Sequence, residues 1–188
     1  GFPWIRDTCV MRAGDGAYYM TGTSGDMDAI HLWRSADLRR FDYLKPAFAF
    51  DKSDAGAWYN AVPTRLLWAP EIHFLDGNYW IAWCVNHGLG MGLLKSQSGR
   101  PEGPYVPTYE GNRAFLKPQI DASLFTGDDG TPWFVWQGRY IRKMKKDRSD
   151  FDGEQIELLT VDGEQVGYEG IFLRKILGWH VVLAAEWN

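Results

Sequence analysis

The chain has 188 residues, a net charge of −4 and an aromatic content of 15%, and charges of both signs are spread along it. A nucleic-acid partner favours a protein with a basic face, so this composition argues against one. No stretch approaches the ~20 consecutive apolar residues that a membrane-spanning helix needs, so no membrane partner is expected either.

Short aromatic and β-branched runs, separated by Gly, Asp, Asn and Pro, predict strands and turns along the whole chain. The first unit of strands is expected over residues 7–44. Residues 45–63 are expected to form a long connection with a short helix, lying over one rim of the domain. Further units are expected over 64–106 and 120–159, with part of a fourth from residue 168. No segment has a helical period, so the predicted class is all-β.

The four units share one frame: an apolar approach, a key residue, an apolar run and then a turn. The turns begin at Asp15, Asp76, Asp129 and Leu177, each followed by Gly. Eight residues before these turns stand Asp7, Trp68, Asp121 and Glu169. Units of roughly 40–50 residues with four strands each predict the blades of a β-propeller. Since the innermost strand of each blade lines the axis, the key residues would face one funnel.

Three carboxylates in one funnel have a direct chemical use. Like charges held close together cannot all ionise easily, so one can serve as a general acid and another as a base. Glycoside hydrolysis needs such a pair. Taken singly, Asp7 or Asp121 would fit a turn cap, and Trp68 would fit a core residue that plugs the axis. Glu71, three residues after Trp68, is predicted to lie on the opposite strand face in a structural hydrogen bond.

Other reactive residue types predict no further site. Cys9 and Cys84 lie within predicted strands and are expected to be buried free thiols. The histidines lack metal-ligand spacing, so no metal ligands are assigned. The basic cluster over residues 142–148 is expected to form an outer strand and its turn.

Four ordered segments resemble glycoside hydrolase family 43, whose members are inverting glycosidases built on a five-bladed β-propeller. They are Arg6-Asp7-Thr8, Trp68-Ala69-Pro70-Glu71-Ile72, Ile120-Asp121-Ala122-Ser123-Leu124-Phe125 and Tyr168-Glu169-Gly170. Thr8 and Ile171 stand where the family usually has Pro, and neither change removes a reactive group. The resemblance implies a single catalytic domain over 1–188, a partial propeller of three full blades and part of a fourth.

The resemblance also implies roles for individual residues. Asp7 would be the general base, Glu169 the general acid, and Asp121 the residue that raises the pKa of the acid and orients it. Trp68, Trp4 and Arg6 would contact the substrate. Inversion requires about 6.5–9.5 Å between the carboxyl groups of Asp7 and Glu169.

The implied substrate is a plant-type polysaccharide or oligosaccharide that carries arabinofuranosyl, xylosyl or galactosyl groups. An extracytoplasmic location fits such substrates. No cofactor is required, although calcium or sodium often binds beside a His of the fifth blade, for which this sequence has no counterpart. Two alternatives stay open: a non-catalytic carbohydrate-binding propeller, and a retaining fructan-hydrolase relative, which would carry Asn-Asp-Pro and Glu-Cys segments.

Overall fold

The computed structural model describes residues 4–61, 65–86, 89–108, 114 and 119–186. Within them the chain forms antiparallel sheets and one short 3-10 helix, Trp58–Asn60, without any α-helix. No helix in this described part is long and apolar enough to cross a membrane. The predicted all-β class is confirmed.

Three sheets have four strands, and in each the spatial order follows the chain order. Blade 1 contains β1 (Ile5–Arg12), β2 (Tyr18–Ser24), β3 (Ala29–Ser35) and β4 (Asp42–Ala49). Blade 2 contains β5 (Leu67–Leu75), β6 (Asn78–Val85), β7 (Gly90–Ser96) and β8 (Tyr105–Pro107). Blade 3 contains β9 (Ser123–Thr126), β10 (Pro132–Trp136), β11 (Tyr140–Met144) and β12 (Phe151–Glu157). Blade 4 contains β13 (Glu169–Ile176) and β14 (Trp179–Ala185).

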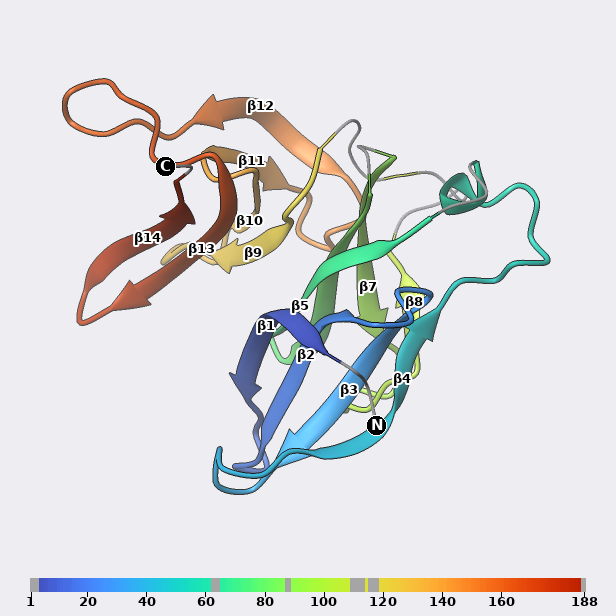
Figure 1. Ribbon diagram of the computed structural model, residues 1–188. Helices are drawn as coiled ribbons and strands as arrows, with labels where there is room; N and C mark the ends of the chain where they lie inside the picture. Colours follow the sequence, from blue (N-terminus) through green and yellow to red (C-terminus); the bar gives the residue numbers. More distant parts are fainter. Residues whose placement is uncertain (1–3, 62–64, 87–88, 109–113, 115–118, 187–188) are drawn as a thin grey trace.

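The first strands of the blades are neighbours in space. β1 contacts β5, β5 contacts β9, and β9 contacts β13, so consecutive blades meet along these strands. Figure 1 shows the sheets following one another, with β13 and β14 at the C-terminal end. This is the arrangement of propeller blades around an axis. Three full blades and part of a fourth are therefore present among the described residues, as predicted.

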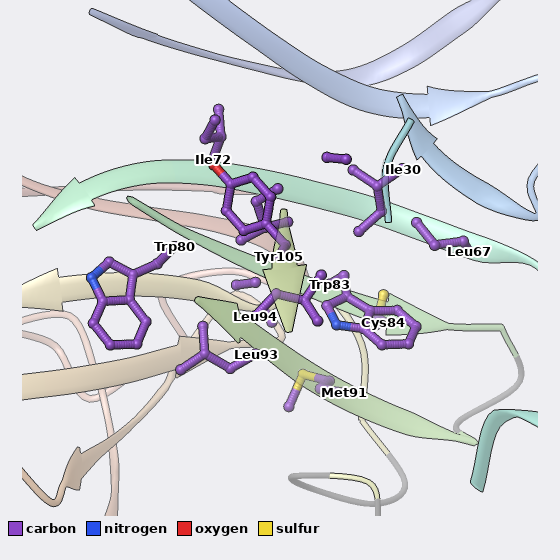
Figure 2. Close-up of a cluster of buried hydrophobic side chains, with 14 of the residues drawn as sticks. Ile30, Leu67, Ile72, Trp80, Trp83, Cys84, Met91, Leu93, Leu94 and Tyr105 are labelled. Atoms are coloured by element: carbon purple, nitrogen blue, oxygen red, sulfur yellow. The ribbon is translucent and has the colours of Figure 1, made fainter. Parts of the chain in front are cut away.

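The core contains several aromatic rings in contact where blades 1 and 2 meet. β6 is almost continuously apolar and buried, because both of its faces are covered. The Trp83 ring lies 5.2 Å from Phe48 and 5.3 Å from Trp58, centroid to centroid. Gly92 lets this indole approach, since a Cβ there would lie 2.5 Å from the ring nitrogen. Figure 2 shows the cluster around Trp83, with Ile30 of blade 1 within it.

The connection predicted over residues 45–63 is partly wrong. β4 continues to Ala49 and includes Pro46, which an edge strand tolerates because its N–H is not needed for pairing. The short helix is confirmed, and its Trp58 and Tyr59 are buried in the core rather than exposed. Residues 62–64 lie outside the described part.

Candidate active site

A β-bulge interrupts three of the first strands near their N-terminal ends. The pairing shifts by one residue between Arg6 and Cys9 in β1, between Trp68 and Glu71 in β5, and between Glu169 and Ile171 in β13. Bulges of this kind redirect side chains and are common next to active sites.

Each bulge contains a residue in the left-handed backbone region. These residues are Asp7, Ala69 and Gly170, with φ of 50°, 43° and 56°. In blade 3 the same conformation occurs at Asp121, with φ of 57°, two residues before β9. Aspartate tolerates this region better than most residues, and glycine adopts it freely. Two of the three predicted acids thus occupy a backbone position that few side chains accept, which is typical of functional sites.

The four key residues of the repeat line one cavity. Its volume is about 690 Å³, and Asp7, Trp68, Asp121 and Glu169 all contribute to its wall. Arg6 lines it as well. Trp4 is not part of the described lining: it is 41% exposed, and the Arg6 guanidinium lies 5.7 Å from its ring centroid. The structure therefore brings together five of the six predicted site residues.

Asp7 is held from one side only. Its Oδ2 accepts a hydrogen bond from the Thr23 hydroxyl at 2.8 Å, and the Arg6 Nε lies 3.5 Å from the same oxygen. Its Oδ1 has no hydrogen-bond partner among the described residues, and the side chain is 45% exposed. One carboxylate oxygen is thus fixed while the other is free in the cavity.

Asp121 is held by the neighbouring blade. Its Oδ2 accepts the backbone N–H of Gly170 at 2.9 Å. Burial is the main cause that raises the pKa of Asp121, and the negative charges of Glu169, Asp7 and Glu71 raise it further against the opposing effect of the Gly170 N–H. The negative charges of the neighbouring carboxyl groups therefore reach Asp121.

Glu71 is a further carboxylate of this cavity, and its predicted position on the opposite strand face is wrong. The extra residue between Trp68 and Glu71 reverses the alternation of the pleat, so both side chains reach the same cavity. The predicted structural hydrogen bond is present, because Glu71 Oε2 accepts the Ser123 hydroxyl at 2.6 Å. The Ala-Pro pair between Trp68 and Glu71 was a signal for an irregular strand at this point.

A series of polar side chains connects Glu71 in blade 2 with Arg174 in blade 4. His73 Nε2 lies 3.1 Å from Glu71 Oε2, and Arg174 Nη2 lies 2.9 Å from His73 Nδ1. A guanidinium can only donate, so Nδ1 accepts and the ring proton lies on Nε2, facing Glu71. Burial lowers the pKa of His73, which is consistent with a neutral ring.

Both nitrogens of His73, the buried histidine of β5, face other side chains, so neither is available to a metal ion. No group of three or more His, Cys, Asp or Glu in the described ranges is placed to hold a metal ion.

The sequence matches the model for glycosyl hydrolases family 43 over residues 4–187. The chain belongs to this family. Curated relatives of this family 43 chain include the beta-D-galactofuranosidase xynD of Aspergillus niger, 28% identical over 56% of the chain and 33% of that protein. The extracellular endo-alpha-(1->5)-L-arabinanase 1 of Bacillus subtilis is 25% identical over 76% of the chain and 47% of its own length. The family 43 chain thus spans less than half of either relative.

Solved structures agree on the fold of the family 43 chain. A family 43 protein of Bacillus licheniformis matches 96% of it with a TM-score of 0.74 at 22% identity, over 36% of that protein. The native arabinanase of Bacillus subtilis matches 97% of it with a TM-score of 0.70 at 19% identity, over 67% of that protein. At such identities the likeness supports the propeller fold alone.

Proposed function

We propose that this chain carries the acid–base centre of a glycosidase that hydrolyses O-glycosidic bonds with inversion. The observation that supports this most is the convergence of Asp7, Asp121 and Glu169 on one cavity, although they lie in three different blades. Family membership supports hydrolysis of a glycosidic bond as the reaction.

Asp7 is the proposed general base. Its Oδ1, which has no protein partner in the described part, takes a proton from the water that attacks the anomeric carbon. Glu169 is the proposed general acid and gives its proton to the leaving oxygen as the glycosidic bond breaks. One bond forms between the anomeric carbon and the water oxygen, and one breaks between that carbon and the leaving oxygen. The proton from water ends on Asp7, and the proton from Glu169 ends on the leaving group.

Asp121 is the proposed modulator of this pair. A carboxylate next to a second carboxyl group disfavours ionisation of that group, which is the role proposed for Asp121 towards Glu169. The Gly170 N–H fixes Asp121 next to the residue that follows Glu169.

The proposed substrate contacts come from residues around the acids. The Trp68 indole provides a flat apolar wall against which a sugar ring can stack. Arg6 lies beside the base and can donate to sugar hydroxyls. Trp4 extends this side through its contact with Arg6.

The proposed substrates are arabinofuranosyl, xylosyl or galactosyl groups of plant-type polysaccharides or oligosaccharides. Two relatives support the choice, because their names describe a galactofuranosidase and an arabinanase. The relatives named extracellular also support an extracytoplasmic location.

The test uses the intact protein and nitrophenyl arabinofuranosides, xylosides and galactosides. Asp7→Asn and Glu169→Gln should each lower kcat/KM by about 10²–10⁴-fold, the usual contribution of a general acid or base. Asp42→Asn, at an exposed ion pair with Arg40, serves as the control. Proton NMR of the first product should show the inverted anomer.

Two outcomes would replace the proposal with the alternatives. Sugar binding without turnover, unchanged by Asp7→Asn, would favour a carbohydrate-binding propeller. Retention of the anomeric configuration would favour a double-displacement mechanism, which places the two carboxyl groups only about 5 Å apart.

A further inference from the structure

Thr23 connects the proposed base to the neighbouring blade. It lies in β2 and is fully buried, with 0% of its surface exposed. Its Oγ1 lies 2.8 Å from Asp7 Oδ2 and 2.8 Å from the backbone nitrogen of Ala69. Ala69 belongs to blade 2 and is the left-handed residue of the bulge in β5.

The direction of both hydrogen bonds follows from donor chemistry. A backbone N–H can only donate, so Thr23 Oγ1 accepts from Ala69. The one hydroxyl proton of Thr23 is therefore available for Asp7, whose ionised carboxylate can only accept. A hydrogen bond to a charged acceptor is stronger than one between neutral groups, and it favours the charged form.

We infer that Thr23 is a positioning residue for the proposed base. Its hydroxyl occupies Oδ2 of Asp7, so Oδ1 is the oxygen that receives the proton, and it holds the carboxylate aimed into the cavity. The inference rests on the proposed function, since it assigns how Asp7 is prepared for that reaction.

The boundary between blades 3 and 4 supports this inference independently. There the N–H of Gly170, also a left-handed bulge residue, donates directly to Asp121 Oδ2 at 2.9 Å. At both boundaries the N–H of a bulge residue points back to the preceding blade and ends at an acid. Between blades 1 and 2 the Thr23 hydroxyl is inserted as a relay. Asp7 and Asp121 are thus each connected to the following blade by the N–H of a bulge residue, through Thr23 for Asp7 and directly for Asp121.

Thr21 provides a matched control. It lies in the same strand and is also fully buried, and its hydroxyl donates to the Pro70 carbonyl of blade 2 at 2.7 Å. Thr21→Val removes a buried hydroxyl and a hydrogen bond across the same boundary, but it leaves every acid of the cavity untouched. An effect on catalysis that is specific to Thr23 therefore comes from its hydrogen bonds to Asp7 and Ala69, and the Asp7→Asn background described below isolates the first of them.

The experiment compares Thr23→Val, Thr23→Ser and Thr21→Val in the intact protein. Thr23→Val should lower kcat by about 10–100-fold, the range expected for one hydrogen bond to a charged group, while KM changes little. The acidic limb of its kcat/KM profile should move to higher pH, because the ionised carboxylate has lost a donor. Thr23→Ser keeps the donor and should restore most of kcat, and Thr21→Val should retain the wild-type profile.

A double-mutant cycle separates positioning from folding. In the Asp7→Asn background, Thr23→Val should cause almost no further loss, since the base is already absent. If Thr23→Val loses the native circular dichroism spectrum, Thr23→Ala is compared with Thr21→Ala by the same measurements.

The inference is overturned if the Thr23 variants match the Thr21 variants in kcat and in the acidic limb while Asp7→Asn still lowers kcat/KM strongly. If Asp7→Asn itself leaves activity unchanged, the proposed function fails instead, so the two failures are distinguishable.

Discussion

The backbone N–H of Gly170 in blade 4 donates a hydrogen bond of 2.9 Å to Oδ2 of Asp121 in blade 3. Gly170 directly follows Glu169, so one peptide unit joins the proposed acid to its modulator. Its φ of 56° lies in the left-handed region, and a Cβ there would meet no atom within 4 Å. A side chain at position 170 is therefore disfavoured by the backbone conformation and not by a lack of space.

Gly170→Ala should lower both stability and activity. An alanine in the left-handed region costs about 1–2 kcal/mol, so the free energy of unfolding should fall by that amount. Relief of this strain would turn the N–H away from Asp121 and disturb Glu169. Gly16→Ala is the control: this turn glycine has φ of 84° and equally open surroundings, and it does not line the cavity. Urea unfolding should show similar losses for both variants, and kinetics should show a loss of kcat for Gly170→Ala only.

Asp121→Asn should stabilise the protein at neutral pH while lowering its activity. Because the pKa of Asp121 is raised above its ordinary 3.8, the folded protein keeps, between 3.8 and the raised value, a proton that the unfolded chain has lost. Stability therefore falls as pH rises from about 3.8 through the raised value, and the variant escapes this fall. Its Tm should exceed that of the wild type at pH 7 by roughly 1–3 °C, and the difference should disappear below about pH 3.5.

Asp128→Asn offers a control of opposite sign. The ion pair with Lys175 lowers the pKa of Asp128, so this group contributes stability above its ordinary value and loses it as pH falls. The variant should be less stable than the wild type at pH 7. Equal pH dependence in both variants would contradict the assignment of the raised pKa to Asp121.

Arg148 gives a prediction about stability alone. This residue of the predicted basic outer cluster is fully buried, stacks 5.2 Å above the Trp80 ring and donates to Asp76. Its Nε and Nη1 are buried without hydrogen-bond partners in the described part. Burial lowers the pKa of Arg148, as expected for a cation removed from water.

Asp76→Asn should therefore cost more than Arg148→Met. The first change leaves a buried cation without its counter-charge, at about 2–4 kcal/mol, whereas methionine fills the space and removes the charge. Urea midpoints with unchanged m-values would measure both, and Asp42→Asn at the exposed pair with Arg40 should change little. A larger loss for Arg148→Met would mean that the cation itself stabilises the fold.

Cys9 and Cys84 should not react with thiol reagents in the native protein at pH 8. Both thiols are free and buried, as predicted from the sequence. Burial raises the pKa of Cys9 to about 12, and it also raises the pKa of Cys84. The thiolate is the reactive form, so labelling should require unfolding. A chromogenic disulfide should report no native thiols and two in urea, and rapid native labelling would show that the blades open locally.

Counting back from the turns located the acids, but it aligned blades 2 and 4 one residue away from the equivalent position in blades 1 and 3. In blades 2 and 4 the first hairpins are two-residue turns with positive φ throughout, Asp76-Gly77 and Leu177-Gly178. In blades 1 and 3 the loops are longer, over residues 13–17 and 127–131. Counting back from the turns therefore reaches the left-handed residue itself at Asp7 and Asp121, but the residue before it at Trp68 and Glu169. All four side chains still line the cavity, because a bulge also changes the direction of the side chains next to it.

The sequence by itself determined which residue types recur at the heads of the blades, the all-β class and the burial of both thiols. These follow from local spacing, turn chemistry and apolar content, which are present in the chain before it folds. The tertiary structure alone decided that Glu71 reaches the cavity, that Thr23 holds Asp7, and that Arg148 is buried. Each of these depends on a single extra residue in a strand or on a contact between blades. Which residues meet across an interface depends on the partner surface, so this cannot be read from the order of residues along one strand.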